Sequence, residues 1–259
     1  MNNRNAPVIN LPVKRKTEKH NPTIIAYFNK SNGRAGARYL NKLMHKNLKP
    51  SNTASVCFIQ SPLDKISNRI IKRTIDIILA VIVIAGILSW LIPIMAILIK
   101  ATSRGPVFFL QKRNKQNAAV FTCIKFRSMV VNTVADILPV EENDKRITSV
   151  GRVIRKTFID ELPQFFNVLW GDMSIVGPRP HMLKEHLKFE SLVPNYNFRD
   201  NVKPGITGLS QIAGLEGPAN TIMKMNSRVT TDNIYIRNWS LKLDLMIILR
   251  TIYKLSGAR

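Results

Sequence analysis

The chain is organised around one stretch near its middle, Arg155-Lys-Thr-Phe-Ile-Asp-Glu-Leu-Pro-Gln-Phe-Phe-Asn-Val-Leu-Trp-Gly-Asp-Met-Ser-Ile-Val-Gly-Pro-Arg-Pro180. This stretch contains two adjacent carboxylates, Asp160 and Glu161, in a chain with 16 acidic residues against 39 basic ones. An Asp-Glu pair in such a basic sequence indicates a use for negative charge, as a nucleophile, a metal ligand or both. A compatible structural interpretation is a capping box, Thr157 to Asp160, at the start of a helix.

The residues after the acidic pair predict a helix and a rigid turn. Residues 162–169 have an apolar helical face, and Pro163 is tolerated in a first turn, which favours Asp160 over Thr157 as the cap. The turn Gly177-Pro-Arg-Pro180 would fix Arg179 between two prolines. A fixed guanidinium can bind a phosphate through two hydrogen bonds.

The composition restricts the partners and the compartment. A length of 259 residues allows one or two domains, and the net charge of +23 predicts a polyanionic partner: nucleic acid, an anionic membrane or phosphorylated substrates. The two cysteines provide no disulfide framework or metal site, so a reducing cytoplasm is expected. No secretory signal is expected, because the first sixty residues are polar and basic.

The first segment, residues 1–64, is rich in Asn and Lys. Residues 1–60 hold eleven Lys and Arg but one acid, Glu18. Such a segment suits either attraction to anionic lipid or a solvated, partly disordered tail, and both interpretations stay open.

Residues 65–104 contain the membrane segment. Ile77 to Ile99 is a run of 23 residues without a charge, which is long enough to cross a bilayer. Pro93 lies inside the run, where it removes a backbone hydrogen bond and bends a helix. Basic residues flank both ends, which fits a re-entrant helix-break-helix, whereas a spanning helix concentrates them on one side. The residues alone leave a kinked spanning helix equally open.

Two strands are predicted after the membrane segment. Residues 105–113 and 120–129 carry β-branched and aromatic side chains and would pair as a hairpin around residues 114–119. Lys125 and Arg127 would share one face of the second strand, where two cations suit a phosphate. At the end of the chain, residues 241–255 suit either a helix in the membrane interface, anchored by Trp239 and Tyr253, or a docked core helix.

The ordered motifs resemble a known family, the bacterial sugar transferases, which are monotopic polyprenyl-phosphate phosphoglycosyl transferases. The resemblance runs from about Lys72 to Tyr253, and its landmarks occur in family order: Lys72-Arg-x-x-Asp76, the Pro-broken helix, Gly105-Pro-Val-Phe, Gln111-x-Arg113, Lys125-Phe-Arg-Ser-Met129, Asp160-Glu-Leu-Pro-Gln164, Asn167-Val-Leu-x-Gly-Asp-Met-Ser-x-Val-Gly-Pro-Arg-Pro180, Pro204-Gly-Ile-Thr-Gly208 and Asn238-Trp-Ser-x-x-x-Asp244. Single pieces are weak signals, but the ordered set is specific.

The resemblance implies a reaction and its residues. A sugar-1-phosphate would pass from a UDP-sugar to undecaprenyl phosphate, the first membrane step of exopolysaccharide, capsule or O-antigen synthesis, and UMP would be released. Asp160 would be the nucleophile and form a phosphosugar-aspartate, and Glu161 would help to hold Mg²⁺. The candidates for phosphate contacts are Lys125, Arg127, Arg152 and Arg179.

The resemblance also implies the architecture and the surroundings. We expect a helix-rich α+β monotopic membrane protein with a re-entrant helix broken at Pro93, a small β-hairpin and interfacial helices around the active site. Residues 1–64 would be a basic extension, 65–104 the membrane helix with its flanks, and 105–259 a catalytic domain on the cytoplasmic face of the bacterial inner membrane. The expected partners include anionic lipids and no nucleic acid, and a homo-oligomer is left open.

Four departures from the family pattern keep alternatives open. Lys115 and Ala118 replace glycines after Gln111-x-Arg113, Ile92 replaces a serine before the helix-breaking proline, and the loop 214–219 lacks an arginine. The N-terminal membrane helices and linker domain of many larger relatives are not expected here. One alternative is therefore a family member that scaffolds polysaccharide assembly without catalysis. The other is a membrane-tethered basic binding module, which gives no reason for the Asp-Glu pair.

Overall fold

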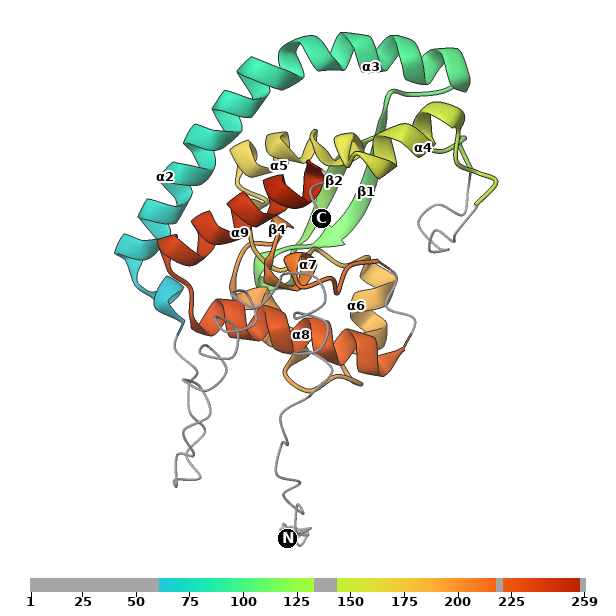
Figure 1. Ribbon diagram of the computed structural model, residues 1–259. Helices are drawn as coiled ribbons and strands as arrows, with labels where there is room; N and C mark the ends of the chain where they lie inside the picture. The colour runs from blue at the N-terminus through green and yellow to red at the C-terminus, as the bar shows by residue number, and fades with distance from the viewer. Residues whose placement is uncertain (1–60, 133–143, 218–220, 257–259) are drawn as a thin grey trace, which may run out of the picture.

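The computed structural model describes residues 61–132, 144–217 and 221–256, so the expectations for residues 1–60 lie outside it (Figure 1). This part of the chain is rich in helix and contains a small antiparallel hairpin, as predicted, and it also contains a second, parallel two-stranded sheet that was not predicted. The helices are α2 (Ile66–Val83), α3 (Ser89–Thr102), α4 (Ser149–Lys156), α5 (Gln164–Trp170), α6 (Leu183–Phe189), α7 (Leu209–Ile212), α8 (Ile222–Arg237) and α9 (Leu241–Leu255), with single 3-10 turns η1 (Pro62–Asp64), η3 (Gln116–Ala118), η4 (Ile159–Glu161) and η5 (Tyr196–Asn201).

The apolar segment forms a bent helix that arches over the rest of the molecule. Ile66–Thr102 is the one helix within the described residues that is long and apolar enough to cross a membrane. It consists of α2, a π-helical turn over Ile84–Leu88, and α3, and its direction changes between the two α-helices (Figure 1). Many of its apolar side chains are exposed, and Ile97 reaches 70%. The outer face of the arch is therefore suited to lipid.

Side chains take over the hydrogen bonds that the bend disturbs. The Ser89 N–H bonds to the carbonyl of Ile84, five residues back, which is the π-helical pattern. The Ser89 hydroxyl donates to Ala85 O at 2.7 Å, and the Trp90 indole donates to Gly86 O at 2.8 Å. The prediction of a helix break at Pro93 is wrong in its position, because α3 continues through Pro93 to Thr102 and the irregular turn, Ile84–Leu88, precedes it. Pro93 has no N–H to donate within α3. Ser89 thus supplies a hydroxyl near the bend although Ile92 stands where relatives have serine.

The predicted hairpin is confirmed. Strands β1 (Phe108–Asn114) and β2 (Val120–Phe126) pair antiparallel, from Phe108 opposite Phe126 to Asn114 opposite Val120. In the connecting turn, Asn117 and Ala118 adopt positive φ angles of 60° and 54°. Glycine adopts this region without strain and alanine does not. The turn therefore keeps the positive φ angle that favours glycine, although the residue at this position is Ala118.

Neither predicted cap of the helix after the acidic pair is correct. Helix α5 begins at Gln164 after Pro163, and no side chain caps it. Thr157 instead ends α4, where its hydroxyl donates to Val153 O at 2.9 Å. Phe158 follows with a left-handed φ of 58°, which turns the chain before Asp160. The acidic pair therefore lies in the 3-10 turn η4, between α4 and α5.

Two glycine-containing turns pack against each other at the centre of the fold. Strands β3 (Ser174–Val176) and β4 (Gly205–Thr207) pair in parallel, and the Gly177 N–H donates to Thr207 O at 2.9 Å. A Cβ atom on Gly205 would overlap the backbone nitrogen and Cα of Gly177. This close contact positions the turn that carries Arg179.

We expect Gly205→Ala to destabilise the protein by about 3 kcal/mol or more, because the added methyl group meets backbone that cannot move aside. Thermal unfolding in detergent, followed by tryptophan fluorescence, measures this loss. Gly86→Ala is the matched control. A Cβ atom there meets nothing within 4 Å, and alanine favours helix by about 0.5–1 kcal/mol. Equal unfolding temperatures for the two variants would contradict the close-contact interpretation.

The last helix is docked against the core by one apolar face, as the second interpretation of residues 241–255 predicts, and its other apolar face is exposed; its position in a membrane interface stays a prediction. Leu243 and Ile247 of α9 are fully buried, whereas Leu245 and Leu249 are more than half exposed. The prediction of Trp239 as an interfacial anchor is wrong. Trp239 is buried, and its indole N–H donates to Asp244 Oδ2 at 2.9 Å, which draws the ring into the core.

Asp244 joins three elements of the fold. Lys72 of α2 forms an ion pair with its carboxylate at 2.7 Å, and the Tyr235 hydroxyl of α8 donates to it at 2.8 Å. Arg73 of α2 donates to the carbonyls of Val168 and Leu169 at the end of α5. The first and last landmarks of the family pattern thus fasten the arch to the body of the protein.

Candidate active site

The two carboxylates of η4 have different surroundings. Glu161 accepts from Lys125 Nζ of β2 at 2.9 Å and from Arg179 Nη2 at 2.5 Å. Asp160 is buried to 7% exposure, and no residue that the structure describes forms a hydrogen bond or an ion pair with it. The predicted residues Lys125, Glu161 and Arg179 therefore meet in one cluster, beside an aspartate that is left uncommitted.

The pKa values of the two carboxyls are pushed in opposite directions. Burial raises the pKa of Asp160 to about 6, and the negative charge of Glu161 adds to this effect against the pull of Lys125. Burial also opposes the charge on Glu161, but its bonds to Arg179 and Lys125 outweigh that and hold the pKa well below the usual range. Carboxyls with divergent pKa values in one cleft are typical of catalytic sites.

Two arginines, the half-buried Arg113 and the buried Arg199, fix the turn that presents Arg179. Arg113 donates to the carbonyl of Pro180 at 2.6 Å, and Arg199 donates to the carbonyl of Arg179, also at 2.6 Å. Arg113 is held in turn by the side chain of Gln111. The Gln111-x-Arg113 landmark thus acts on the turn through its backbone.

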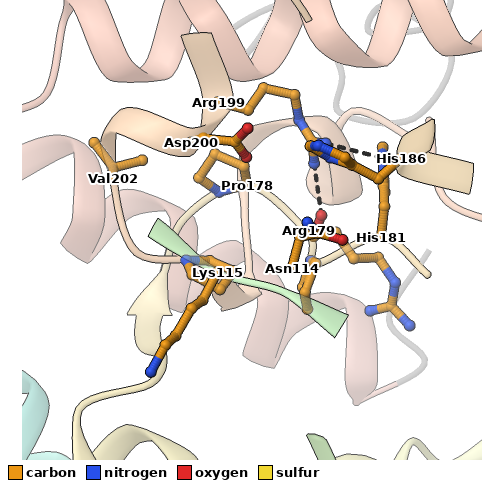
Figure 2. A pocket seen from close by; sticks show the side chains of 11 residues that line it. Asn114, Lys115, Pro178, Arg179, His181, His186, Arg199, Asp200 and Val202 are labelled. Atoms are coloured by element: carbon orange, nitrogen blue, oxygen red, sulfur yellow. Dashed lines mark hydrogen bonds between the residues drawn. The ribbon is translucent and has the colours of Figure 1, made fainter. Parts of the chain in front are cut away.

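Arg199 is itself held by a buried network behind the turn. Its guanidinium donates to Asp232 Oδ2 at 2.9 Å and to His181 Nδ1 at 2.9 Å, and Figure 2 shows the bonds to His181 and to the Arg179 carbonyl. Sequence reasoning missed the role of Arg199 and Asp232. They are 33 positions apart, and no local pattern signals that they pair across the fold.

A cleft of about 550 Å³ opens at the acidic pair. One part of its wall is apolar and comes from β1, from the end of β2 and from the chain that follows β2. The apolar residues are Phe108, Phe109, Leu110, Phe126, Met129, Val130 and Val131. The charged residues that line it are Arg113, Lys125, Arg127, Arg155, Asp160, Glu161, Arg179, Glu185 and Arg228. A predominantly cationic wall suits phosphate groups, and an adjoining apolar wall suits a hydrocarbon.

Two of the predicted phosphate contacts have other surroundings. Arg152 is exposed on α4 and is not among the residues that line the cleft, whereas Arg155, one turn later, lines it. Arg127 lines the cleft, but its guanidinium donates to the carbonyls of Ser103 and Arg104 after α3. Lys125 and Arg127 therefore line the same cleft, as their shared face predicts. Lys125 pairs with Glu161, whereas Arg127 binds backbone carbonyls.

The acidic pair suits a metal ion that arrives with a phosphorylated substrate. Among the described residues, no group of three or more His, Cys, Asp or Glu could form a complete metal site. Mg²⁺ is commonly bound by one or two carboxylates together with substrate phosphates. Asp160 and Glu161 provide such a donor set, in which Glu161 would share its oxygens with Lys125 and Arg179.

Comparison with known proteins gives consistent results. A protein of Klebsiella pneumoniae named UDP-glucose:undecaprenyl-phosphate glucose-1-phosphate transferase is 44% identical over 200 residues, 77% of this chain and 43% of that protein. The exopolysaccharide production protein PSS of Rhizobium leguminosarum bv. phaseoli is 40% identical over 191 residues, 71% of this chain and 94% of that protein. A UDP-N-acetylgalactosamine-undecaprenyl-phosphate N-acetylgalactosaminephosphotransferase of Aeromonas hydrophila is 44% identical over 183 residues, 70% of this chain and 43% of that protein.

The chain spans less than half the length of two of these three relatives. The bacterial sugar transferase family matches residues 67–257, which include the bent helix, the hairpin, the acidic pair and the Gly-Pro-Arg-Pro turn. Since the match covers most of the chain and all of the cleft, the protein belongs to the bacterial sugar transferase family.

Proposed function

We propose that the protein transfers a sugar-1-phosphate from a UDP-sugar to undecaprenyl phosphate and releases UMP. The observation that carries the proposal is Asp160, a buried carboxylate without a partner among the described residues, in a cationic cleft. The names of the relatives support the reaction class, because they specify UDP-sugar donors and an undecaprenyl-phosphate acceptor. These relatives are named for different sugars, so the donor sugar is left to experiment.

The proposed reaction has two displacements at one phosphorus atom. A carboxylate oxygen of Asp160 attacks the β-phosphorus, the bond from that phosphorus to the bridging oxygen breaks, and UMP departs with the electron pair. An oxygen of the lipid phosphate then attacks the phosphosugar-aspartate and releases the Asp160 carboxylate. Arg179 and Lys125 neutralise Glu161 and hold positive charge beside the reacting phosphate. Mg²⁺, held by Glu161 with the donor diphosphate, would screen the negative charge that repels the nucleophile.

The direct test is UMP release by purified protein with Mg²⁺ and undecaprenyl phosphate across a panel of UDP-sugars. Release with one sugar supports the reaction and identifies the donor. Folded protein that releases no UMP with any member of the panel would contradict the proposal and favour a scaffold without catalysis.

The pH dependence of turnover provides an independent check on Asp160. Burial is the largest cause that raises the pKa of this carboxyl to about 6, and only the ionised form is a nucleophile. We therefore expect kcat/KM to be constant above pH 7 and to fall tenfold per pH unit below about pH 6. A profile that stays flat down to pH 4.5 would contradict this assignment. Circular dichroism at each pH provides the control for unfolding.

We propose that the arch enters and leaves the inner membrane by the cytoplasmic face. Basic residues flank both of its ends, which suits anionic lipid on one side of the bilayer. In protein without Cys57 and Cys123, we expect Lys65→Cys and Arg104→Cys to react with an impermeant maleimide in inverted vesicles only. Both positions are exposed in the structure. Labelling of the two cysteines from opposite sides would mean that the helix spans the membrane.

A further inference from the structure

Glu185 is a carboxylate of the cleft that the proposed reaction does not use. It lies on α6, and no ion pair within the described residues involves it. The cations that influence it electrostatically, Arg113 and Arg228, are occupied elsewhere. Arg113 donates to the carbonyl of Pro180, and Arg228 donates to backbone carbonyls in the loop before Gly217 and at Gly217 itself. The negative charge of Glu185 therefore faces the cleft without a dedicated counter-ion.

The backbone at the start of α6 holds the Glu185 side chain in place. The Met182 N–H donates to Glu185 Oε2 at 3.3 Å, as in the second half of a capping box. Oε1 has no partner among the residues that the structure describes. A carboxylate that is fixed through one oxygen and open at the other can accept hydrogen bonds from a ligand without first losing rotamer freedom.

A carboxylate opposes phosphate binding by charge repulsion, so its presence in a phosphate cleft indicates a different ligand group. Ionised carboxylates accept strong hydrogen bonds from hydroxyl groups. A nucleotide sugar carries hydroxyls on its ribose and on its hexose. We propose that Glu185 is a specificity-determining residue that accepts hydrogen bonds from hydroxyl groups of the donor. This inference rests on the proposed function.

Glu185→Gln separates this role from an electrostatic one. Glutamine keeps an oxygen for the Met182 N–H, so the start of α6 is preserved. If Glu185 only repels phosphate, its neutralisation should raise kcat/KM for the UDP-sugar. If it binds hydroxyls, kcat/KM should fall about tenfold. This factor corresponds to the difference in strength between a charge-assisted hydrogen bond and a neutral one. An unchanged or increased kcat/KM would overturn the proposal.

The same variant distinguishes the two sources of hydroxyl groups. A ribose contact predicts weaker UDP binding by calorimetry and a smaller preference for UDP over 2′-deoxy-UDP. A hexose contact predicts UDP binding that is not weakened, together with a raised KM for the UDP-sugar and a smaller preference between sugar epimers. If Glu185→Gln weakens neither UDP binding nor the use of the UDP-sugar, the proposal is overturned.

Glu190→Gln is the matched control, because Glu190 follows α6, is partly exposed and does not line the cleft. We expect it to leave kcat/KM within about twofold of wild type. UMP release by wild-type protein must be established in the same experiment. Its absence contradicts the proposed function, whereas an active wild type with an unaffected Glu185→Gln contradicts only the role of Glu185.

Discussion

Asp160→Asn should abolish transfer and, at the same time, make the protein more stable. The variant loses the carboxylate that we propose as the nucleophile, so we expect kcat to fall by at least about 10⁴-fold. It also removes a buried negative charge that has no hydrogen-bond partner among the described residues. Loss of activity with gain of stability is the pattern of a residue retained for function and not for folding.

The sign of the stability change follows from the raised pKa of Asp160. In the folded protein this pKa is about 6, against 3.8 for an unperturbed aspartate. The folded state therefore binds more protons than the unfolded state between these values, and wild-type stability declines as the pH rises from about 4 to about 6. Above pH 7 the ionised group costs up to about 3 kcal/mol. Asp160→Asn should be more stable by up to that amount at pH 8, and the difference from wild type should vanish by about pH 3, below the pKa of the unfolded state.

Two measurements complete the experiment. Incubation of wild-type protein with the UDP-sugar alone should leave a phosphosugar on the peptide that contains Asp160, detected by mass spectrometry, and the asparagine variant should show none. Asp172→Asn is the control, because Asp172 is partly exposed and forms an ion pair with Lys115. It should change activity and stability little. An asparagine variant at position 160 that keeps its turnover would place the nucleophile elsewhere.

The sequence predicted the elements that local patterns determine. The hairpin is confirmed because alternating β-branched and aromatic side chains specify strands over short distances. The grouping of Lys125, Glu161 and Arg179 could also be predicted, because family motifs marked each residue. Local patterns did not determine the caps of α5, because Phe158 adopts a left-handed conformation that no propensity rule assigns to phenylalanine.

The site and anchor residues that were assigned incorrectly or missed have one physical cause in common. Tertiary contacts determine which of several chemically similar residues reaches the cleft or the surface. Arg152 and Arg155 are both basic residues of α4, and the direction of the helix alone brings Arg155 to the cleft. Trp239 has the composition of an interfacial anchor, but a buried acceptor on α9 determines its position. Pairings such as Arg199 with Asp232 depend on the packing of distant elements.

Asp244→Ala should be the most destabilising single substitution of the network that fastens the arch. Asp244 accepts from Lys72 at 2.7 Å, from Tyr235 at 2.8 Å and from Trp239 at 2.9 Å. Its removal leaves a lysine ammonium at 11% exposure and the buried indole N–H of Trp239 without an acceptor, whereas the Tyr235 hydroxyl keeps the carbonyl of Val176 as an acceptor at 3.1 Å. An uncompensated buried charge costs about 3–5 kcal/mol. Denaturant unfolding in detergent, followed by tryptophan fluorescence, measures the loss.

A second substitution separates the buried charge from the lost packing. Lys72→Met removes the ammonium, so the double variant Lys72→Met, Asp244→Ala should recover about 1–3 kcal/mol relative to the sum of the single changes. Glu216→Ala is the control, because it removes a different ion pair of α9. Glu216 lies between α7 and α8 and pairs with Lys254 of α9, and the side chains of Lys254 and Glu216 are 43% and 37% exposed. An exposed pair contributes at most about 1 kcal/mol. Strictly additive effects of the two changes would show that Lys72 and Asp244 stabilise the protein independently, and that the ion pair between α2 and α9 does not hold the arch in place.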